Sequence, residues 1–260
     1  MEQLEWYHFI FMLLAGSAAG VVNTLAGSGS VFTLTVLIFA GLPADIANGT
    51  NRIGTTVQSF IATGTFYKNG MLPFKQSLHY TIPALVGALI GAVTAAEISG
   101  ETMELIIGGI MLLLLLITLF KPQQYINTDA IKDKNHWLQY VVFAGIGFYG
   151  GFIQAGIGIF LLVALSVASH FSMVEANAVK ILTVMLFSLP VLGIFIYNNQ
   201  VNWPIGLWVA VGQAIGSFLT AKFAVKSTSA NIWIKRILIL MMLITIFKVF
   251  GAIDWVMKLL

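Results

Sequence analysis

The chain has 260 residues, of which 58% are hydrophobic and only 9% are charged, and its net charge is +3. Soluble domains carry about 25% charged residues, so a protein surrounded by water could not cover this much apolar surface, whereas lipid can solvate it. The basic residues are few and spread along the chain, which argues against a nucleic-acid-binding face. Because cysteine is absent, disulfides and thiolate metal sites are excluded. The composition predicts an all-α integral membrane protein.

The N-terminal residues do not resemble a cleaved signal peptide. Glu2 and Glu5 precede the first apolar run, and no lysine or arginine occurs before Arg52. Since a signal peptide needs a basic region before its apolar run, we expect the first apolar run to belong to the mature protein.

Ten apolar segments follow one another along the chain. They lie near 7–26, 30–41, 45–67, 74–96, 103–120, 137–154, 158–170, 174–197, 204–223 and 232–251. A bilayer core needs about 20 apolar residues per helix, so 30–41 and 158–170 are too short to span it comfortably. Each follows a glycine-rich break, at 26–30 and at 154–158. Each is therefore either a crossing or half of a re-entrant hairpin, and we expect about 8–10 transmembrane helices.

The basic residues mark three loops as cytoplasmic. They are Lys68 and Lys75, then Lys121, Lys132 and Lys134, and finally Lys222, Lys226, Lys235 and Arg236. The connections at 97–104 and 198–203 contain no basic residue. By the positive-inside rule, we expect these two connections and both termini to lie outside, most simply in a bacterial inner (plasma) membrane.

Short sequence matches relate the two halves of the chain. Gly27-Ser28-Gly29 corresponds to Gly156-Ile157-Gly158, and Ala47-Asn48 corresponds to Ala176-Asn177, both at a spacing of 129 residues (27 to 156, 47 to 176). With an odd number of segments in each half, the second half enters the membrane from the opposite side.

We therefore expect two inverted five-segment repeats, residues 1–120 and 137–260, joined by a cytoplasmic linker at 121–136. Glycine-interrupted helices at equivalent places in inverted repeats indicate a transporter site. A broken helix exposes unpaired N–H groups and the positive end of its dipole, and two such ends can hold an anion. The alternative is that the glycines only allow close helix packing. We favour a site for the two breaks, and packing for the glycines of 87–91 and 212–216.

Two basic residues, Arg52 and Lys180, lie deep inside predicted membrane segments. Each is about eight residues from its segment start, hence about 12 Å deep. A buried cation marks a functional path by default, and no carboxylate lies within one helical turn of either residue. An anionic substrate would supply the missing charge; the alternatives are backbone carbonyls or a distant carboxylate.

The predicted substrate-binding residues surround the breaks and the two cations. They are Gly27, Ser28, Gly29, Asn48, Asn51, Arg52, Thr55, Gln154, Gly156, Gly158, Asn177 and Lys180. The asparagines and Thr55 could instead form hydrogen bonds between helices. Gln58, Gln213 and His79 are weaker candidates.

Several of these stretches resemble the sulfite exporter TauE/SafE family, over nearly the whole chain. They are 23–30, Gly41-Leu42-Pro43-Ala44, Gly49-Thr50-Asn51-Arg52, 147–152 and Lys180-Ile181-Leu182. The resemblance implies export or uptake of sulfite, sulfonates or related sulfur-containing anions, driven by an ion gradient. Arg52 stands where the family often has lysine, and Ser28 and Ser30 interrupt the glycine run, so we transfer no particular substrate.

Our leading hypothesis is a secondary transporter, an exporter or permease, that binds a small anion at the midplane between the halves and works by alternating access. H⁺ or Na⁺ is the expected coupling ion, and a homodimer is a candidate assembly. A passive anion channel is the alternative. A membrane enzyme or metal site is disfavoured because the four histidines, His8, His79, His136 and His170, are scattered, and we expect no cofactor. A structural subunit would show no stabilisation by ligands.

Overall fold

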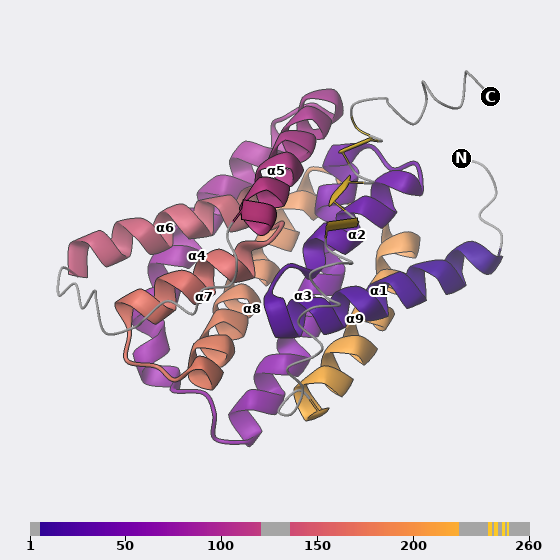
Figure 1. The fold of residues 1–260 in the computed structure, drawn as a ribbon. Helices are drawn as coiled ribbons and strands as arrows, with labels where there is room; N and C mark the ends of the chain where they lie inside the picture. The colour runs from indigo at the N-terminus through magenta and orange to yellow at the C-terminus, as the bar shows by residue number, and fades with distance from the viewer. Residues whose placement is uncertain are drawn as a thin grey trace.

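The computed structural model describes residues 6–120, 136–223 and scattered positions between 239 and 249. Within these residues the chain is entirely α-helical or in turns and connections, which confirms the all-α prediction (Figure 1). The helices are α1 (Trp6–Ala26), α2 (Gly29–Phe39), α3 (Ala44–Lys68), α4 (Phe74–Ala96), α5 (Gly100–Phe120), α6 (His136–Phe152), α7 (Ile157–Ala168), α8 (Met173–Tyr197) and α9 (Trp203–Phe223). Three predicted parts lie outside the described residues: both termini, the linker at 121–136 apart from residue 136, and most of the segment at 232–251.

Four of the described helices are long and apolar enough to cross a membrane, judged by length and composition. These stretches are Phe74–Ala96, Gly100–Leu119, Met173–Tyr197 and Trp203–Thr220. Large apolar side chains such as Leu105, Leu113 and Leu189 are exposed along them. In a bilayer, lipid would cover these side chains.

α3 differs from these helices because it is polar and lies inside the bundle. It has 25 residues, as many as α8, and its buried residues include Asn48, Asn51 and Gln58. It packs against α8 and α9. Because neighbouring helices rather than lipid surround its polar face, α3 can carry amide and hydroxyl groups at membrane depth.

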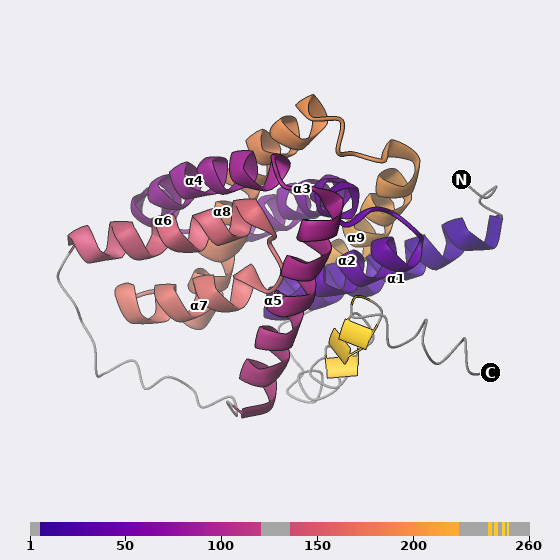
Figure 2. The ribbon, with the colours of Figure 1, turned by 90° about the horizontal axis from the view of Figure 1, so that it is seen from above.

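Two helix pairs pack closely through glycine, α1 with α9 and α4 with α6, and both views show each pair side by side (Figures 1 and 2). At each glycine of these contacts an added Cβ would enter the backbone of the partner helix. The glycines are Gly16, Gly20, Gly212 and Gly216 in the first pair and Gly87, Gly91, Gly147 and Gly151 in the second. The packing role predicted for the glycines of 87–91 and 212–216 is confirmed.

The two short helices each follow a break in the chain. α2 has 11 residues and α7 has 12, so each is about 17 Å long, roughly half of a bilayer core. After α1 the chain folds back, because Gly29 lies against Ala19 and Asn23 of α1. This geometry fits the hairpin alternative, and all of α2 from Gly29 to Ile38 is buried.

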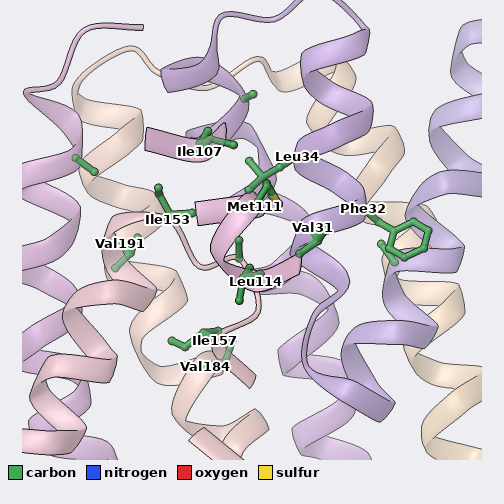
Figure 3. Close-up of a cluster of buried hydrophobic side chains, with 14 of the residues drawn as sticks. Val31, Phe32, Leu34, Ile107, Met111, Leu114, Ile153, Ile157, Val184 and Val191 are labelled. Carbon is green, nitrogen blue, oxygen red and sulfur yellow. The ribbon is translucent and has the colours of Figure 1, made fainter. Parts of the chain in front are cut away.

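An apolar cluster surrounds the breaks. α5 contributes Met103, Ile107, Met111 and Leu114, spaced so that they form one stripe along the helix. In Figure 3, Met111 and Leu114 of this stripe lie among side chains of two other regions. These are Val31 and Leu34 of α2, and Ile153 and Ile157 beside the second break. This stripe fixes the breaks from one side.

Candidate functional site

The two helix breaks touch each other in the interior. Both turn at a glycine with positive φ, +71° at Gly27 and +69° at Gly156, a conformation that other residues adopt with strain. The backbone N–H of Gly158 donates to the carbonyl of Gly27 at 3.0 Å. A Cβ on either Gly27 or Gly158 would enter the backbone of the other. Two segments far apart in sequence therefore meet at a contact that only glycine fits.

Arg52 is fully buried on α3 and bonds to the end of α6. One terminal nitrogen, Nη1, donates to the carbonyl of Gly150 at 2.6 Å and to Oε1 of Gln154 at 2.9 Å. The other, Nη2, donates to the carbonyl of Gly151 at 2.9 Å and to Oδ1 of Asn48 at 3.1 Å. The guanidinium also lies over the Phe195 ring, 5.3 Å from its centroid, which is within cation–π distance.

The bonds of Arg52 have a structural meaning. Nδ2 of Asn48 donates to the carbonyl of Phe152 at 2.7 Å, so Asn48 and Arg52 together satisfy three carbonyls in the last turn of α6. A broken helix leaves these carbonyls without helical donors, and a cation at this end also compensates the helix dipole. Arg52 and Asn48 form a cap for α6.

Lys180, on α8, stands in a similar relation to α1. Its ammonium Nζ lies 3.4 Å from the carbonyl of Asn23, and Nδ2 of Asn177 donates to the carbonyl of Thr24 at 3.3 Å. An asparagine and a cation again reach the last carbonyls of a broken helix. The difference is that Lys180 makes a single long bond although its ammonium has three N–H donors. Lys180 is only 2% exposed.

Neither cation has an acidic partner among the described residues. Within the part of the chain that the structure describes, the polar contacts of Arg52 and Lys180 are carbonyl and amide oxygens, and no carboxylate lies within ion-pair distance of either. Asp45 and Glu175 lie in the first turns of α3 and α8, and Glu175 forms a capping box with Ser172. Glu175 therefore serves its own helix start, and Asp45 lies 3.5 Å from Nε2 of Gln200.

A small cavity lies beside Lys180. It is lined by Asn23, Thr24, Gly27, Gln58, Ser59, Ala62, Gln154, Ile157, Gly158, Lys180, Ile181, Val184 and Ser217. Its volume is about 20 Å³, room for about one water molecule. Its lining includes lysine, amide and hydroxyl side chains as well as aliphatic ones, so a small anionic or polar ligand could be accommodated once the cavity widens.

The predicted site residues separate into three groups. Gly27, Gln154, Gly158 and Lys180 line the cavity. Asn48, Arg52 and Asn177 cap the broken helices instead. The others support the breaks: Ser28 and Gly29 begin α2, Asn51 accepts a hydrogen bond from Thr33, Thr55 contacts Gln154, and Gly156 lies against Leu114.

Several lining residues were not among the predicted site residues. They are Asn23, Thr24, Ser59, Ala62, Ile157, Ile181, Val184 and Ser217, while Gln58 was a weaker candidate. Some of them could have been predicted from helical spacing, because positions 58, 59 and 62 of α3 lie on the same face as the predicted site residue Thr55. Asn23 and Ser217 join the site through tertiary contacts between α1 and α9, which no local pattern reveals.

A helical membrane fold with a buried lysine beside a small interior cavity is compatible with a membrane transport protein. The sequence profile described as sulfite exporter TauE/SafE matches residues 12–249, and the chain belongs to this family. This confirms the resemblance found in the sequence, and the chain is thus a member of a family of membrane transporters.

Curated relatives agree with this class. A probable membrane transporter protein, ORF9, of a Sinorhizobium species is 24% identical over 228 residues, covering 86% of each chain. The probable membrane transporter protein YfcA of Escherichia coli K12 is 24% identical over 82% of this chain and 83% of its own. A probable membrane transporter protein of Haemophilus influenzae is 23% identical over 81% and 83%. No solved structure matches the chain significantly.

Proposed function

We propose that this chain is a secondary transporter for a small anion, and that the anion binds beside Lys180 in the cavity between the two helix breaks. Sulfite, a sulfonate or another sulfur-containing oxyanion is the substrate class that the family suggests. The observation that carries the proposal is a buried lysine with one long hydrogen bond and no carboxylate partner in the described structure, facing a polar cavity.

The charge balance of the site favours an anion. A cation at membrane depth is unfavourable by several kcal/mol unless it is paired. The groups around Lys180 include the amides of Gln58 and Gln154, whose NH2 groups can donate to oxyanion oxygens. The hydroxyls of Ser59 and Ser217 also line the cavity, but they donate to the carbonyls of Thr56 and Gln58. A bound anion would neutralise Lys180 and accept hydrogen bonds from the two amides.

The reciprocal contacts support the inverted-repeat architecture, residues 1–120 against 137–260. An asparagine and a cation of the first half, Asn48 and Arg52, cap α6 in the second half. Asn177 and Lys180 of the second half approach the end of α1 in the first. The α1–α9 and α4–α6 pairs repeat this exchange between halves. Such crossed contacts are what a two-fold relation between the halves would produce.

Two different groups of contacts lie toward the opposite ends of α3, and we propose them as the two barriers of alternating access. If the basic loops lie inside, the inner barrier is a small apolar cluster of Ala62, Phe66, Ala178 and Ile181. The outer barrier is polar: Nε2 of Gln200 lies 3.1 Å from the carbonyl of Ala96 and 3.5 Å from Oδ2 of Asp45. Rocking of one half against the other would open the barriers in turn.

Ligand-dependent thermal stability in detergent tests the proposal. The panel is sulfite, sulfate, thiosulfate, methanesulfonate and acetate, and the variants are Lys180→Gln and, as a matched control, Lys75→Gln at an exposed lysine. A charge-assisted hydrogen bond contributes about 1.5–3 kcal/mol, so we expect Lys180→Gln to lose at least about tenfold in anion affinity and Lys75→Gln to bind like the wild type. Equal binding by Lys180→Gln, or no stabilisation of the wild type by any of these anions, would contradict the proposal.

Counterflow separates a transporter from a passive channel. In proteoliposomes loaded with unlabelled anion, a transporter accumulates external labelled anion transiently, because exchange occurs through one alternately exposed site. A channel would only equilibrate the label. We expect transient accumulation in the wild type and none in Lys180→Gln, and simple equilibration in the wild type would favour the channel.

A further inference from the structure

Gln154 adopts an unusual backbone conformation in the second break. Its φ is +69°, in the left-handed region that costs a non-glycine residue about 1–2 kcal/mol. The second break separates α6 from α7 by residues 153–156, whereas residues 27–28 separate α1 from α2. The longer break thus places a strained glutamine where the first break has no counterpart. Strain of this kind is concentrated at functional sites.

The side chain of Gln154 is held in one orientation by α3. Its Oε1 lies 2.9 Å from Nη1 of Arg52 and 3.2 Å from Oγ1 of Thr55. Because a guanidinium can only donate, the amide atom that faces Arg52 must be the oxygen. The Thr55 hydroxyl also lies 3.2 Å from the carbonyls of Asn51 and Arg52, so Gln154 is one of three acceptors for its hydrogen. With the oxygen held at Arg52, the NH2 group of the amide points away from the guanidinium.

The NH2 group of Gln154 is available to a ligand. Gln154 lines the cavity and is 1% exposed. Among the residues that the structure describes, no acceptor lies within hydrogen-bonding distance of its Nε2. Lys180 and Gln154 therefore place N–H donors around one small space.

Arg52 itself has no terminal donor left for a ligand. Its two Nη atoms carry four N–H groups, and these match four acceptors: the carbonyls of Gly150 and Gly151, Asn48 and Gln154. Its Nε–H has no partner among the described residues, so a direct contact between an anion and the terminal nitrogens, though not Nε, would require one of these four bonds to break.

We propose that Arg52 and Thr55 are positioning residues, which orient the Gln154 amide so that its NH2 group donates to the anion held by Lys180. This inference rests on the proposed function, and it specifies, as the substrate class, an anion that accepts N–H hydrogen bonds from two sides. The charge of Arg52 acts through Gln154, because a hydrogen bond to the carbonyl oxygen of an amide strengthens its N–H donors.

A pair of neighbouring threonines allows a matched test. Thr55→Val removes one of the two groups that hold Oε1 of Gln154, while Thr56→Val changes a buried threonine whose hydroxyl has no partner among the described residues. Sulfate and sulfite affinities are measured by thermal shift or calorimetry. Since a neutral hydrogen bond contributes about 1 kcal/mol, we expect Thr55→Val to bind about fivefold more weakly and Thr56→Val to stay within about twofold of the wild type. An unchanged affinity in Thr55→Val overturns the positioning role.

A second comparison asks whether the effect passes through Gln154. In a Gln154→Met background, Thr55→Val and Arg52→Lys should cause no further loss of affinity, because the group that they orient is gone. Full additivity of the losses would overturn the proposal, since Arg52 or Thr55 would then act on the anion independently. If Arg52→Lys does not fold, the Thr55→Val pair alone decides. Failure of the wild type to bind any anion would instead refute the proposed function, so the two failures are distinguishable.

Discussion

Arg52 and Lys180 are both buried cations on long helices, yet their hydrogen bonds differ. Arg52 makes four bonds with its terminal nitrogens at 2.6–3.1 Å, whereas Lys180 makes one at 3.4 Å. A planar guanidinium can reach several carbonyls at once, whereas an ammonium is a compact charge on a flexible chain. This contrast is the reason why we propose Lys180, rather than Arg52, as the main contact of the ligand.

Removal of the Asn48 side chain tests the capping role at the scale of one residue. Asn48→Ala leaves the carbonyl of Phe152 without its donor and one N–H of Arg52 without its acceptor. An unsatisfied buried polar group costs about 1–3 kcal/mol, so we expect a lower melting temperature in detergent. Asn69→Ala is the control, because Asn69 also bonds a helix carbonyl, that of Thr65, but is exposed. Equal melting temperatures for the two variants would refute a structural cap at Asn48.

At the scale of elements, the two breaks depend on the absence of side chains where they cross. Gly158→Ala would place a Cβ inside the backbone of Gly27, so we expect a loss of at least about 1–3 kcal/mol in stability from overpacking. Gly109→Ala is the matched control, since Gly109 lies within α5 with nothing within 4 Å of an added Cβ. Alanine there should be neutral or stabilising by up to about 1 kcal/mol. Thermal unfolding in detergent gives both values, and similar melting temperatures would contradict the crossing at Gly27 and Gly158.

The breaks and the short helices could be predicted because they have local causes. Glycine runs and apolar segments too short for a bilayer are visible in the sequence itself, and α2 and α7 begin within one residue of the predicted 30 and 158. The depth of Arg52 and Lys180 follows from the helix rise. Their burial, at 0% and 2% exposure, agrees with that prediction.

The different roles of the two cations could not be predicted in the same way. The acceptors of Arg52 lie about 100 positions along the chain, at Gly150 and Gly151, and only the packing of α3 against the second half brings them together. Backbone carbonyls were one of the alternatives that the sequence allowed as partners of Arg52, and in the structure Arg52 donates to two of them. The cavity wall from Asn23 to Ser217 has the same origin, since α1 and α9 pack together.

At the scale of the whole molecule, the cavity is too small for an oxyanion. Its volume of about 20 Å³ holds about one water molecule, so substrate entry requires movement. The proposed inner barrier consists of the apolar side chains of Ala62, Phe66, Ala178 and Ile181, which can separate without breaking a side-chain hydrogen bond. Opening the proposed outer barrier would break the hydrogen bond from Gln200 to the carbonyl of Ala96. We therefore expect the inner side to open more readily.

Thiol labelling of a cavity residue tests the central claim, that an anion enters the space beside Lys180. The chain has no cysteine, so Ser59→Cys, on the cavity wall, introduces a single reactive site. Methanesulfonate and sulfate serve as ligands, because sulfite itself consumes thiol reagents. We predict that a membrane-impermeant reagent labels this cysteine faster from the side of the basic loops. Either anion should slow the reaction, and Lys180→Gln should abolish that protection. Labelling at the same rate with and without both anions, in protein that still carries Lys180, would contradict the account.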